Sequence, residues 1–388
     1  MNFKQDKGDL EKPERKYLNS TQMNRIDADF FTPLTILGMM SGTSLDGLDL
    51  ALCDFWKDGE KFHYKMIQTQ TFTYPQELLQ KLRALFESDA RFFCQTEVEF
   101  STFEAQCVNQ FLEKTEKKPN YIASHGHTVF HQPEKGLTKQ LGNGAILAAK
   151  TGISTICDFR TGDVALGGQG APLVPIGDAL LFAEYDGCLN LGGISNISRG
   201  KIGHRLAYDI SLCNIPLNFL AEQRGFSYDK NGALAQKGTI HPELLDALNR
   251  PDYFSQSGAK SIGFELFANY YKPLLESFPI SVEDKLRTVC EHIAIQIAHH
   301  LRDLQTVLVT GGGAKNSFLI HLIKEKTASL NSNGMNPLVI IPDEQLIDYK
   351  EALVFAFLGY LRVFEANNCL CSVTGALKDS CGGAIYLA

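Results

Sequence analysis

The stretch Leu34-Thr35-Ile36-Leu37-Gly38-Met39-Met40-Ser41-Gly42-Thr43-Ser44-Leu45-Asp46-Gly47-Leu48-Asp49-Leu50-Ala51-Leu52 decides how the rest of the chain is interpreted. It predicts an apolar strand, a turn of small residues and a second strand in which Leu alternates with polar or small residues. The turn offers backbone N–H groups and hydroxyls without bulk, so it could wrap an anion. Asp46 and Asp49 follow at once and could hold a cation bound to that anion, usually through water. A plain hairpin, in which glycine and serine serve only the turn geometry, is the alternative.

The composition is that of an ordinary globular protein, with 44% hydrophobic and 21% charged residues. A chain of 388 residues exceeds what one core usually serves, so we expect two domains. The net charge of -7 argues against nucleic acid as a partner, and no apolar run is long enough to span a bilayer. Ten cysteines without a CxxC pair favour a reducing cytoplasm, with most thiols acting as small buried apolar groups.

The periodicity of the chain predicts alternating strands and helices after an N-terminal extension. Residues 1–33 are expected to be flexible, because they are rich in polar residues and lack the apolar segment of a signal peptide. Further strands are expected over 62–74, 121–124 and 153–157. Helices are expected over 76–86, 97–114, 144–150, 215–222, 283–304, 318–326 and 349–364. This order is typical of an α/β protein whose loops gather at strand ends.

Two further glycine turns follow apolar strands. Asn190-Leu-Gly192-Gly193-Ile-Ser-Asn196 echoes the opening turn as a weak internal repeat, and the two turns could hold one polyphosphate between them. Thr310-Gly311-Gly312-Gly313 ends a β-branched strand, where glycine would let a flat ring such as a purine lie against the backbone, and Asn316 or Ser317 could cap the next helix. Neither a GxxxxGK[ST] loop nor a complete GxGxxG motif is present, which excludes the two commonest nucleotide-binding fingerprints.

Two other polar segments are candidates for ligand contacts. His125-Gly-His-Thr-Val-Phe-His131 has three histidines but no carboxylate or cysteine at ligand spacing, so a strand-end loop touching a substrate is favoured over a zinc site. The glycine-rich run from Gly162 to Pro172 lacks periodicity and predicts a functional or mobile loop. It starts beside Arg160 and contains Asp163, which could orient a ligand or form a structural salt bridge.

Read as text, these motifs resemble a known family. Strand–loop–strand twice, followed by strand–GGG–helix, is similar to the acetate kinase, sugar kinase, heat-shock protein 70 and actin superfamily. GMMSGTSLDGLDLAL, SHGHTVFHQP, DFRTGDVALGGQGAPLVP, NLGGISNIS, VTGGGAKN and KEALVFAFLG resemble the anhydro-N-acetylmuramic acid kinases from about Leu34 to the C-terminus. The resemblance implies two ribonuclease H-like (actin-like ATPase) domains around a central nucleotide cleft, with 34–180 plus 350–388 as domain I and 181–349 as domain II.

The resemblance also implies a reaction. The family uses ATP, Mg²⁺ and water to open the ring of 1,6-anhydro-N-acetylmuramic acid and phosphorylate O6, giving N-acetylmuramic acid 6-phosphate during cell-wall recycling. It further suggests a cytoplasmic homodimer whose ligands are the sugar and ATP. Two alternatives stay open: a plain sugar kinase of the superfamily that hydrolyses nothing, and a nucleotide-gated binding or chaperone-like protein on the same fold.

Individual site residues are implied by matching positions. Asp209, in Tyr208-Asp209-Ile210-Ser211-Leu212-Cys213-Asn214, matches the DTGPGN motif of the catalytic base, although Thr-Gly-Pro-Gly is replaced. Its alternative role is to cap the helix over 215–222. Glu351 matches a substrate-binding glutamate, with a helix-dipole role as its alternative. Contacts with the sugar are implied for Arg160, Asp163, His125 and Thr128. Contacts with ATP are implied for Gly42, Thr43, Ser44, Leu45, Asp46, Gly47, Leu48, Asp49, Gly192, Gly193, Asn196, Gly311, Gly312, Gly313 and Asn316, and Asp46 is also expected near Mg²⁺ through water.

Overall fold

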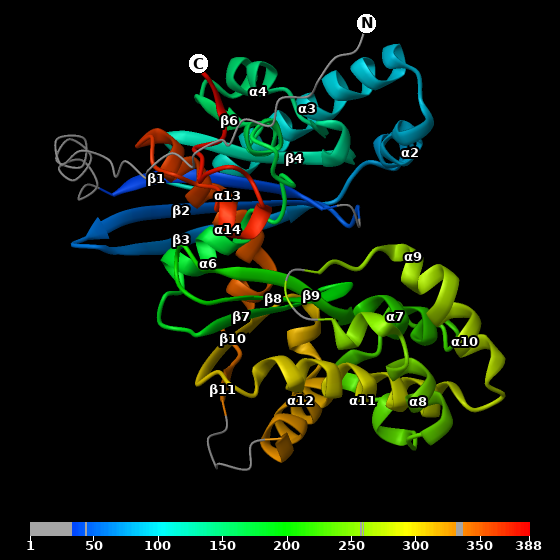
Figure 1. The fold of residues 1–388 in the computed structure, drawn as a ribbon. Helices are drawn as coiled ribbons and strands as arrows, with labels where there is room; N and C mark the ends of the chain where they lie inside the picture. Colours follow the sequence, from blue (N-terminus) through cyan, green and yellow to red (C-terminus); the bar gives the residue numbers. More distant parts are fainter. Residues whose placement is uncertain (1–32, 43–44, 257, 259, 331–336) are drawn as a thin grey trace, which may run out of the picture.

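The chain folds into a mixed α/β structure with two β-sheets (Figure 1). The computed structural model describes residues 33–42, 45–256, 258, 260–330 and 337–388. In the view of Figure 1 the elements of the first sheet lie above those of the second. The N-terminal extension expected over 1–33 falls outside the described residues except for Pro33.

The first sheet grows from the opening hairpin. Its strand order is β12-β6-β4-β1-β2-β3, with β5 paired to β4. The β1–β2 and β2–β3 pairs are antiparallel, whereas β4 runs parallel to β1 and β6 parallel to β4. The strands are β1 Leu34–Ser41, β2 Leu48–Asp58, β3 Lys61–Phe72, β4 Tyr121–Gln132, β5 Leu137–Leu141, β6 Thr155–Cys157 and β12 Ala384–Tyr386.

The second sheet repeats this plan. Its order is β11-β10-β7-β8-β9, and the strands are β7 Gly187–Leu191, β8 Ile194–Arg199, β9 Leu206–Leu212, β10 Thr306–Thr310 and β11 Leu338–Ile340. Strands β7, β8 and β9 are antiparallel, and β10 and β11 add in parallel beyond β7. The order and pairing sense are those of β1, β2, β3, β4 and β6, so the weak internal repeat predicted from two glycine turns is confirmed.

Several helices begin where a side chain caps them. Asp89 accepts a hydrogen bond from the N–H of Phe92, so α3 starts at Ala90 instead of the predicted residue 97. Asp343 does the same for Leu346, which starts α13 at Glu344 instead of residue 349. The helices are α2 Gln76–Ala84, α3 Ala90–Leu112, α4 Gly144–Thr151, α5 Thr161–Ala165, α6 Val174–Leu181, α7 Asn214–Glu222, α8 Pro242–Asn249, α9 Phe264–Leu266, α10 Lys272–Ser277, α11 Val282–Leu301, α12 Ser317–Leu330, α13 Glu344–Val363 and α14 Cys371–Thr374.

The histidine-rich segment is a strand, so the prediction of a loop there was wrong. Strand β4 continues to Gln132 and pairs with β5. Two polar side chains of β4 are buried and bonded: Ser124 donates to Glu104, and His127 Nδ1 lies 3.1 Å from Ser41 Oγ. Such partners come from distant parts of the chain, which is why polarity alone suggested a loop.

Helix α13 packs directly on the first sheet, as predicted for the helix that returns to it. A Cβ at Gly38 of β1 would lie 1.9 Å from the carbonyl oxygen of Ala352, so only glycine allows this approach. Around this contact Leu353, Phe355 and Phe357 are at most 1% exposed. Burial of each such side chain contributes about 1.5–3 kcal/mol. The C-terminal strand β12 also joins this sheet, antiparallel to β6.

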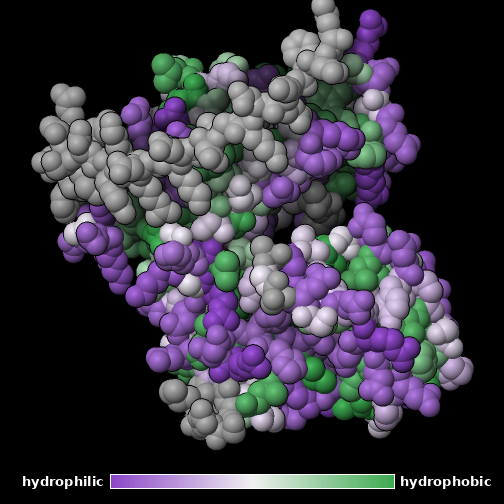
Figure 2. Space-filling model, viewed as in Figure 1, coloured by the Kyte–Doolittle hydropathy of each residue, from purple (hydrophilic) through white to green (hydrophobic). Residues whose placement is uncertain are grey.

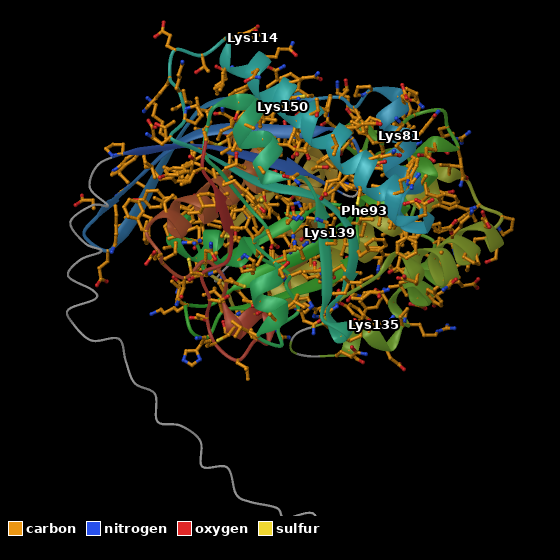
Figure 3. All side chains as sticks on the ribbon, turned by 90° about the horizontal axis from the view of Figure 1, so that it is seen from above. Lys81, Phe93, Lys114, Lys135, Lys139 and Lys150 are labelled. Atoms are coloured by element: carbon orange, nitrogen blue, oxygen red, sulfur yellow. The ribbon has the colours of Figure 1, made fainter. Side chains whose placement is uncertain are left out.

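The outer surfaces carry ordinary polar contacts. Lys139 of β5 pairs with Glu97 of α3 and lies over the ring of Phe93 on the same helix. Lys81 of α2 pairs with Glu99 of α3. The two lysines and Phe93 are labelled in Figure 3. Over the second sheet the visible face is mostly hydrophilic with scattered apolar residues (Figure 2). Among the described helices, none has the length and apolar character that crossing a membrane requires. Seven of the ten cysteines are buried, as predicted.

Candidate functional site

One cavity of about 1220 Å³ is lined by residues from both sheets. The glycine turns after β7 and β10 contribute Gly192, Gly193, Gly311 and Gly312. The segment between β1 and β2 contributes the side chain of Asp46, strand β2 that of Asp49, and helix α13 that of Glu351. The structure thus brings together parts of all three motifs that the sequence singled out.

The wall from the second sheet is built of fixed turns and neutral polar side chains. The N–H groups of Cys213 and Asn214 donate to the carbonyls of Gly193 and Gly192, which ties the β7–β8 turn to the start of α7. Gly311 has φ +81°, and a Cβ there would lie 2.5 Å from Asn190 Oδ1, so this turn requires glycine. The uncharged side chains on this wall are Asn190, Asn196, Asn214, Ser198 and Thr310.

Asp209 is the carboxylate of this wall. It lies on β9, and its Oδ2 accepts hydrogen bonds from the N–H of Ile262 at 2.9 Å and from Ser261 Oγ at 3.1 Å. Burial raises the pKa of Asp209, and these two donors partly offset the rise by favouring the ionised form. The alternative role as a helix cap is wrong, because the N-cap of α7 is Cys213.

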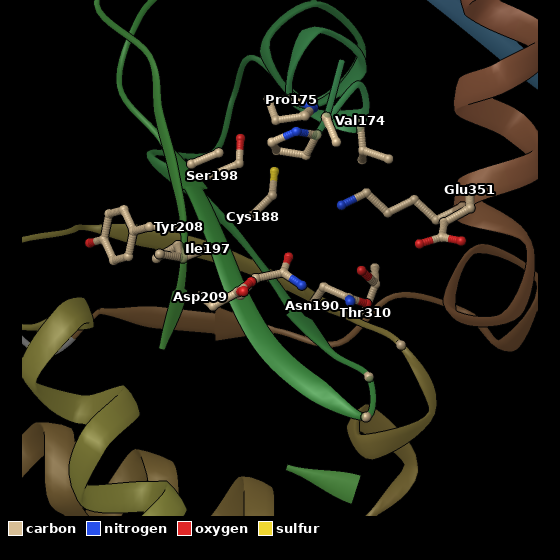
Figure 4. Close-up of a pocket in the computed structure, with 18 of the residues that line it drawn as sticks. Val174, Pro175, Cys188, Asn190, Ile197, Ser198, Tyr208, Asp209, Thr310 and Glu351 are labelled. Carbon is tan, nitrogen blue, oxygen red and sulfur yellow. The ribbon is translucent and has the colours of Figure 1, made fainter. Parts of the chain in front are cut away.

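The opposite wall is acidic. Glu351 and Asp209 point into the cavity from opposite sides (Figure 4). Glu351 is exposed toward the cavity, and the protein atoms packed around it raise its pKa despite the nearby Lys350 and Arg160 cations. Asp49 accepts a 2.6 Å hydrogen bond from Thr71, and burial raises its pKa as well. This wall therefore gathers several carboxyl groups around the cavity.

A buried ion pair on this wall was missed by the sequence reasoning. Lys350 Nζ lies 2.7 Å from Asp178 Oδ1, and the two side chains are only 7% and 3% exposed. The pair joins α13 to α6 and lines the cavity beside Cys188. One signal could have found Asp178, because it interrupts an apolar helical run, and buried charges are almost always paired.

Four of the five residues expected to contact the sugar do not line this cavity. Arg160 Nε and Nη2 bond to His125 Nε2 at 3.1 and 2.8 Å, and Nη1 bonds to the carbonyl of Gly170. Asp163 accepts from the N–H of the same Gly170, so the two charges hold one glycine between them instead of pairing. Burial and the neighbouring Arg160 lower the pKa of His125. Thr128 accepts a bond from Gln140 on β5.

Several residues expected to contact ATP do not line the cavity but pack beside its turns, among them Leu48, Gly313 and Asn316. Leu48 is fully buried, and a Cβ at Gly313 would lie 2.7 Å from Leu191. Asn316 caps α12 by accepting from the N–H of Leu319, as predicted. The N–H of Leu45 donates to the carbonyl of Gly42. Thr43 and Ser44 lie outside the described residues.

Comparisons with known proteins show one family to which this chain is similar along most of its length. The model of the anhydro-N-acetylmuramic acid kinase family matches residues 34–388. An anhydro-N-acetylmuramic acid kinase of Haemophilus influenzae is 37% identical, covering 91% of this chain and 98% of the relative. Proteins of the same name from Vibrio parahaemolyticus and Pseudomonas fluorescens are 34% and 35% identical, and each alignment covers 90% of this chain and at least 97% of the relative.

Proposed function

The chain belongs to the anhydro-N-acetylmuramic acid kinase family, and on this premise we propose that it carries out the family's hydrolytic phosphorylation. The substrate would be 1,6-anhydro-N-acetylmuramic acid, and the product N-acetylmuramic acid 6-phosphate, formed in the cytoplasm during cell-wall recycling. The observation that carries the proposal is one cavity in which Asp209 and Glu351 face each other beside two glycine turns.

We infer that each sheet is the centre of a ribonuclease H-like domain, as in actin-like ATPases. Support comes from the equal strand order and pairing sense of the two sheets, and from the large cavity between them. The expected boundaries, 34–180 plus 350–388 and 181–349, are consistent with α13 packing on β1. A homodimer remains a prediction from the family.

ATP and Mg²⁺ fit the residues of the cavity. Backbone groups at Gly192, Gly193, Gly311 and Gly312, with the amide of Asn196, would hold the phosphates and base. Within the described ranges no three His, Cys, Asp or Glu side chains are grouped to hold a metal. Mg²⁺ commonly uses one or two carboxylates together with substrate phosphates and waters, a role open to Asp46 with Asp49 nearby. When bound, Mg–ATP supplies the phosphoryl group and offsets its charge.

Asp209 would be the general base. In the balanced reaction, water adds to the anomeric carbon, the bond from that carbon to O6 breaks, and O6 forms a bond to the γ-phosphorus as ADP leaves. The proton of the water goes to Asp209, a role that requires an ionised carboxylate facing the cavity. Glu351, on the opposite wall, would bind and orient the sugar. Contacts from Arg160, Asp163, His125 and Thr128 remain predictions, and in this structure they would act through the cavity wall.

Isotopic labelling tests the coupling of hydrolysis to phosphoryl transfer. The purified protein is incubated with ATP, Mg²⁺ and anhydro-sugar in ¹⁸O-labelled water, and the product is analysed by mass spectrometry. We expect one label in the anomeric hydroxyl and none in the phosphate. A phosphorylated sugar without label would instead identify the plain sugar kinase, and ADP release indifferent to the sugar would favour the binding or chaperone-like protein.

A further inference from the structure

Tyr253 and residues 260–262 form hydrogen bonds with Asp209 on the edge strand β9. Strand β9 is the last strand of the second sheet, and its pairing with β8 shifts register next to Asp209, as in a β-bulge. Bulges at sheet edges commonly re-aim a side chain and leave backbone groups unpaired. Here the unpaired groups of Asp209 are taken up by residues 253 and 260, which lie far along the chain.

Four hydrogen bonds connect this segment to Asp209. The backbone N–H of Asp209 donates to the carbonyl of Lys260 at 3.0 Å, and the hydroxyl of Tyr253 donates to the carbonyl of Asp209 at 2.7 Å. The other two bonds, from Ser261 Oγ and the N–H of Ile262, both end on Oδ2 of the carboxylate. Oδ1 has no hydrogen-bond partner in the part of the chain that the structure describes.

We propose that Ser261 is a positioning residue, which together with the N–H of Ile262 fixes Oδ2 of Asp209 so that Oδ1 is the atom that accepts the proton of the attacking water. This inference rests on the proposed function, because it needs Asp209 to be the base. A carboxylate held at one oxygen by two donors cannot turn freely about its last bond. Its other oxygen therefore keeps one direction, and Asp209 and Ser261 both line the cavity.

The same two donors also set the charge state of the base. Burial raises the pKa of Asp209, which favours the protonated form that cannot accept a proton. Donors to the ionised form counteract this rise, so they keep the base available. Removal of the Ser261 hydroxyl should therefore raise the pKa of Asp209 further while also loosening its carboxylate.

Lys260 holds the segment in place without touching the carboxylate. Its Nζ donates to the carbonyls of Tyr253 and Gln256 and lies 4.5 Å from the ring centroid of Tyr253. These contacts hold Lys260, the neighbour of Ser261 in the chain, beside Tyr253. The hydroxyl of Ser261 is consequently the part of this arrangement that a mutation can remove while the backbone bonds remain.

The test compares Ser261→Ala with Ser261→Thr, which keeps a hydroxyl, and with the matched control Ser255→Ala. Ser255 is exposed in the same part of the chain and bonds only to the carbonyl of Asp252. The rate of sugar phosphorylation is measured as kcat/KM across pH. For Ser261→Ala we expect a loss of about tenfold near neutral pH. The acidic limb of the profile should also move to higher pH, because it reports the base of the free enzyme. Ser261→Thr should restore both, and KM for ATP should not change.

Two results would overturn the inference. One is a Ser261→Ala profile that coincides with that of wild type. The other is a loss of rate at all pH values that Thr does not restore, since a merely structural role gives that pattern. Failure of the proposed function would differ from both, because wild-type protein itself would then show no labelled product and Asp209→Asn would keep its turnover.

Discussion

The two walls of the cavity differ in how they can handle charge. The wall of the second sheet offers backbone turns and neutral amides, such as Asn190 and Asn196, whereas the opposite wall carries Asp46, Asp49 and Glu351. Neutral donors can hold an anion by themselves, but carboxylates repel it unless a cation intervenes. A polyphosphate would therefore rest on the second wall and meet the first through a metal ion. Asp209 is the carboxylate on the second wall, where Lys260 also lines the cavity.

The largest effect is expected when Asp209, the carboxylate on the wall of the second sheet, is replaced. In Asp209→Asn we expect kcat to fall about 10³-fold, because an amide cannot accept the proton of water. ATP affinity, measured by calorimetry, should stay near the wild-type value because the glycine turns are untouched. Asp252→Asn, an exposed change in the same half, serves as the control. Near-normal turnover of Asp209→Asn would falsify the assignment of the base.

The acidic wall contains the buried pair of Lys350 and Asp178, and breaking this pair should cost stability. In Lys350→Met the buried Asp178 loses its partner, so the free energy of unfolding should fall by about 3 kcal/mol in urea titrations. The control is Lys315→Met, which breaks the half-exposed pair with Asp348 and should cost at most about 1 kcal/mol. Equal losses for the two variants would show that burial of the first pair does not matter.

On the neutral wall, two adjacent glycines should respond differently to the same methyl group. Gly311→Ala combines positive φ with a 2.9 Å approach to Leu191, and we expect a loss of about 2 kcal/mol in unfolding free energy. Gly312→Ala meets only Asn214 Nδ2 at 3.8 Å, so its stability should change by less than about 0.5 kcal/mol. Thermal unfolding of both proteins checks this order, and a less stable Gly312→Ala would contradict it.

The smallest expected effect concerns the metal. In Asp46→Asn, the Mg²⁺ concentration that gives half-maximal rate at fixed ATP should rise about threefold, because a carboxylate that acts through water contributes modestly. Asp58→Asn, an exposed change at the far end of the same hairpin, should leave the Mg²⁺ dependence unchanged. If both variants respond alike, the acidic wall does not hold the metal.

The sequence predicted the framework better than the supporting contacts. Strands, glycine turns and the return of α13 were predictable because periodicity and turn chemistry are local. The course of β4 was not, since His125 and His127 are buried only because Arg160 and Ser41, distant in sequence, bond to them. The ion pair of Lys350 and the contact of Ser261 with Asp209 likewise join residues far apart, and no spacing rule reports such contacts.

The close contact of α13 with β1 at Gly38 fixes the position of this helix on the first sheet. The helix cannot shift on its sheet without a backbone collision, so Glu351 keeps its position relative to the β1–β2 hairpin. Asp209, by contrast, is fixed to the edge of the other sheet. The group proposed to bind the sugar and the group proposed to activate water therefore sit on elements of different sheets. Water activation and sugar binding would coincide only at one spacing of the two sheets, which would guard ATP against futile hydrolysis.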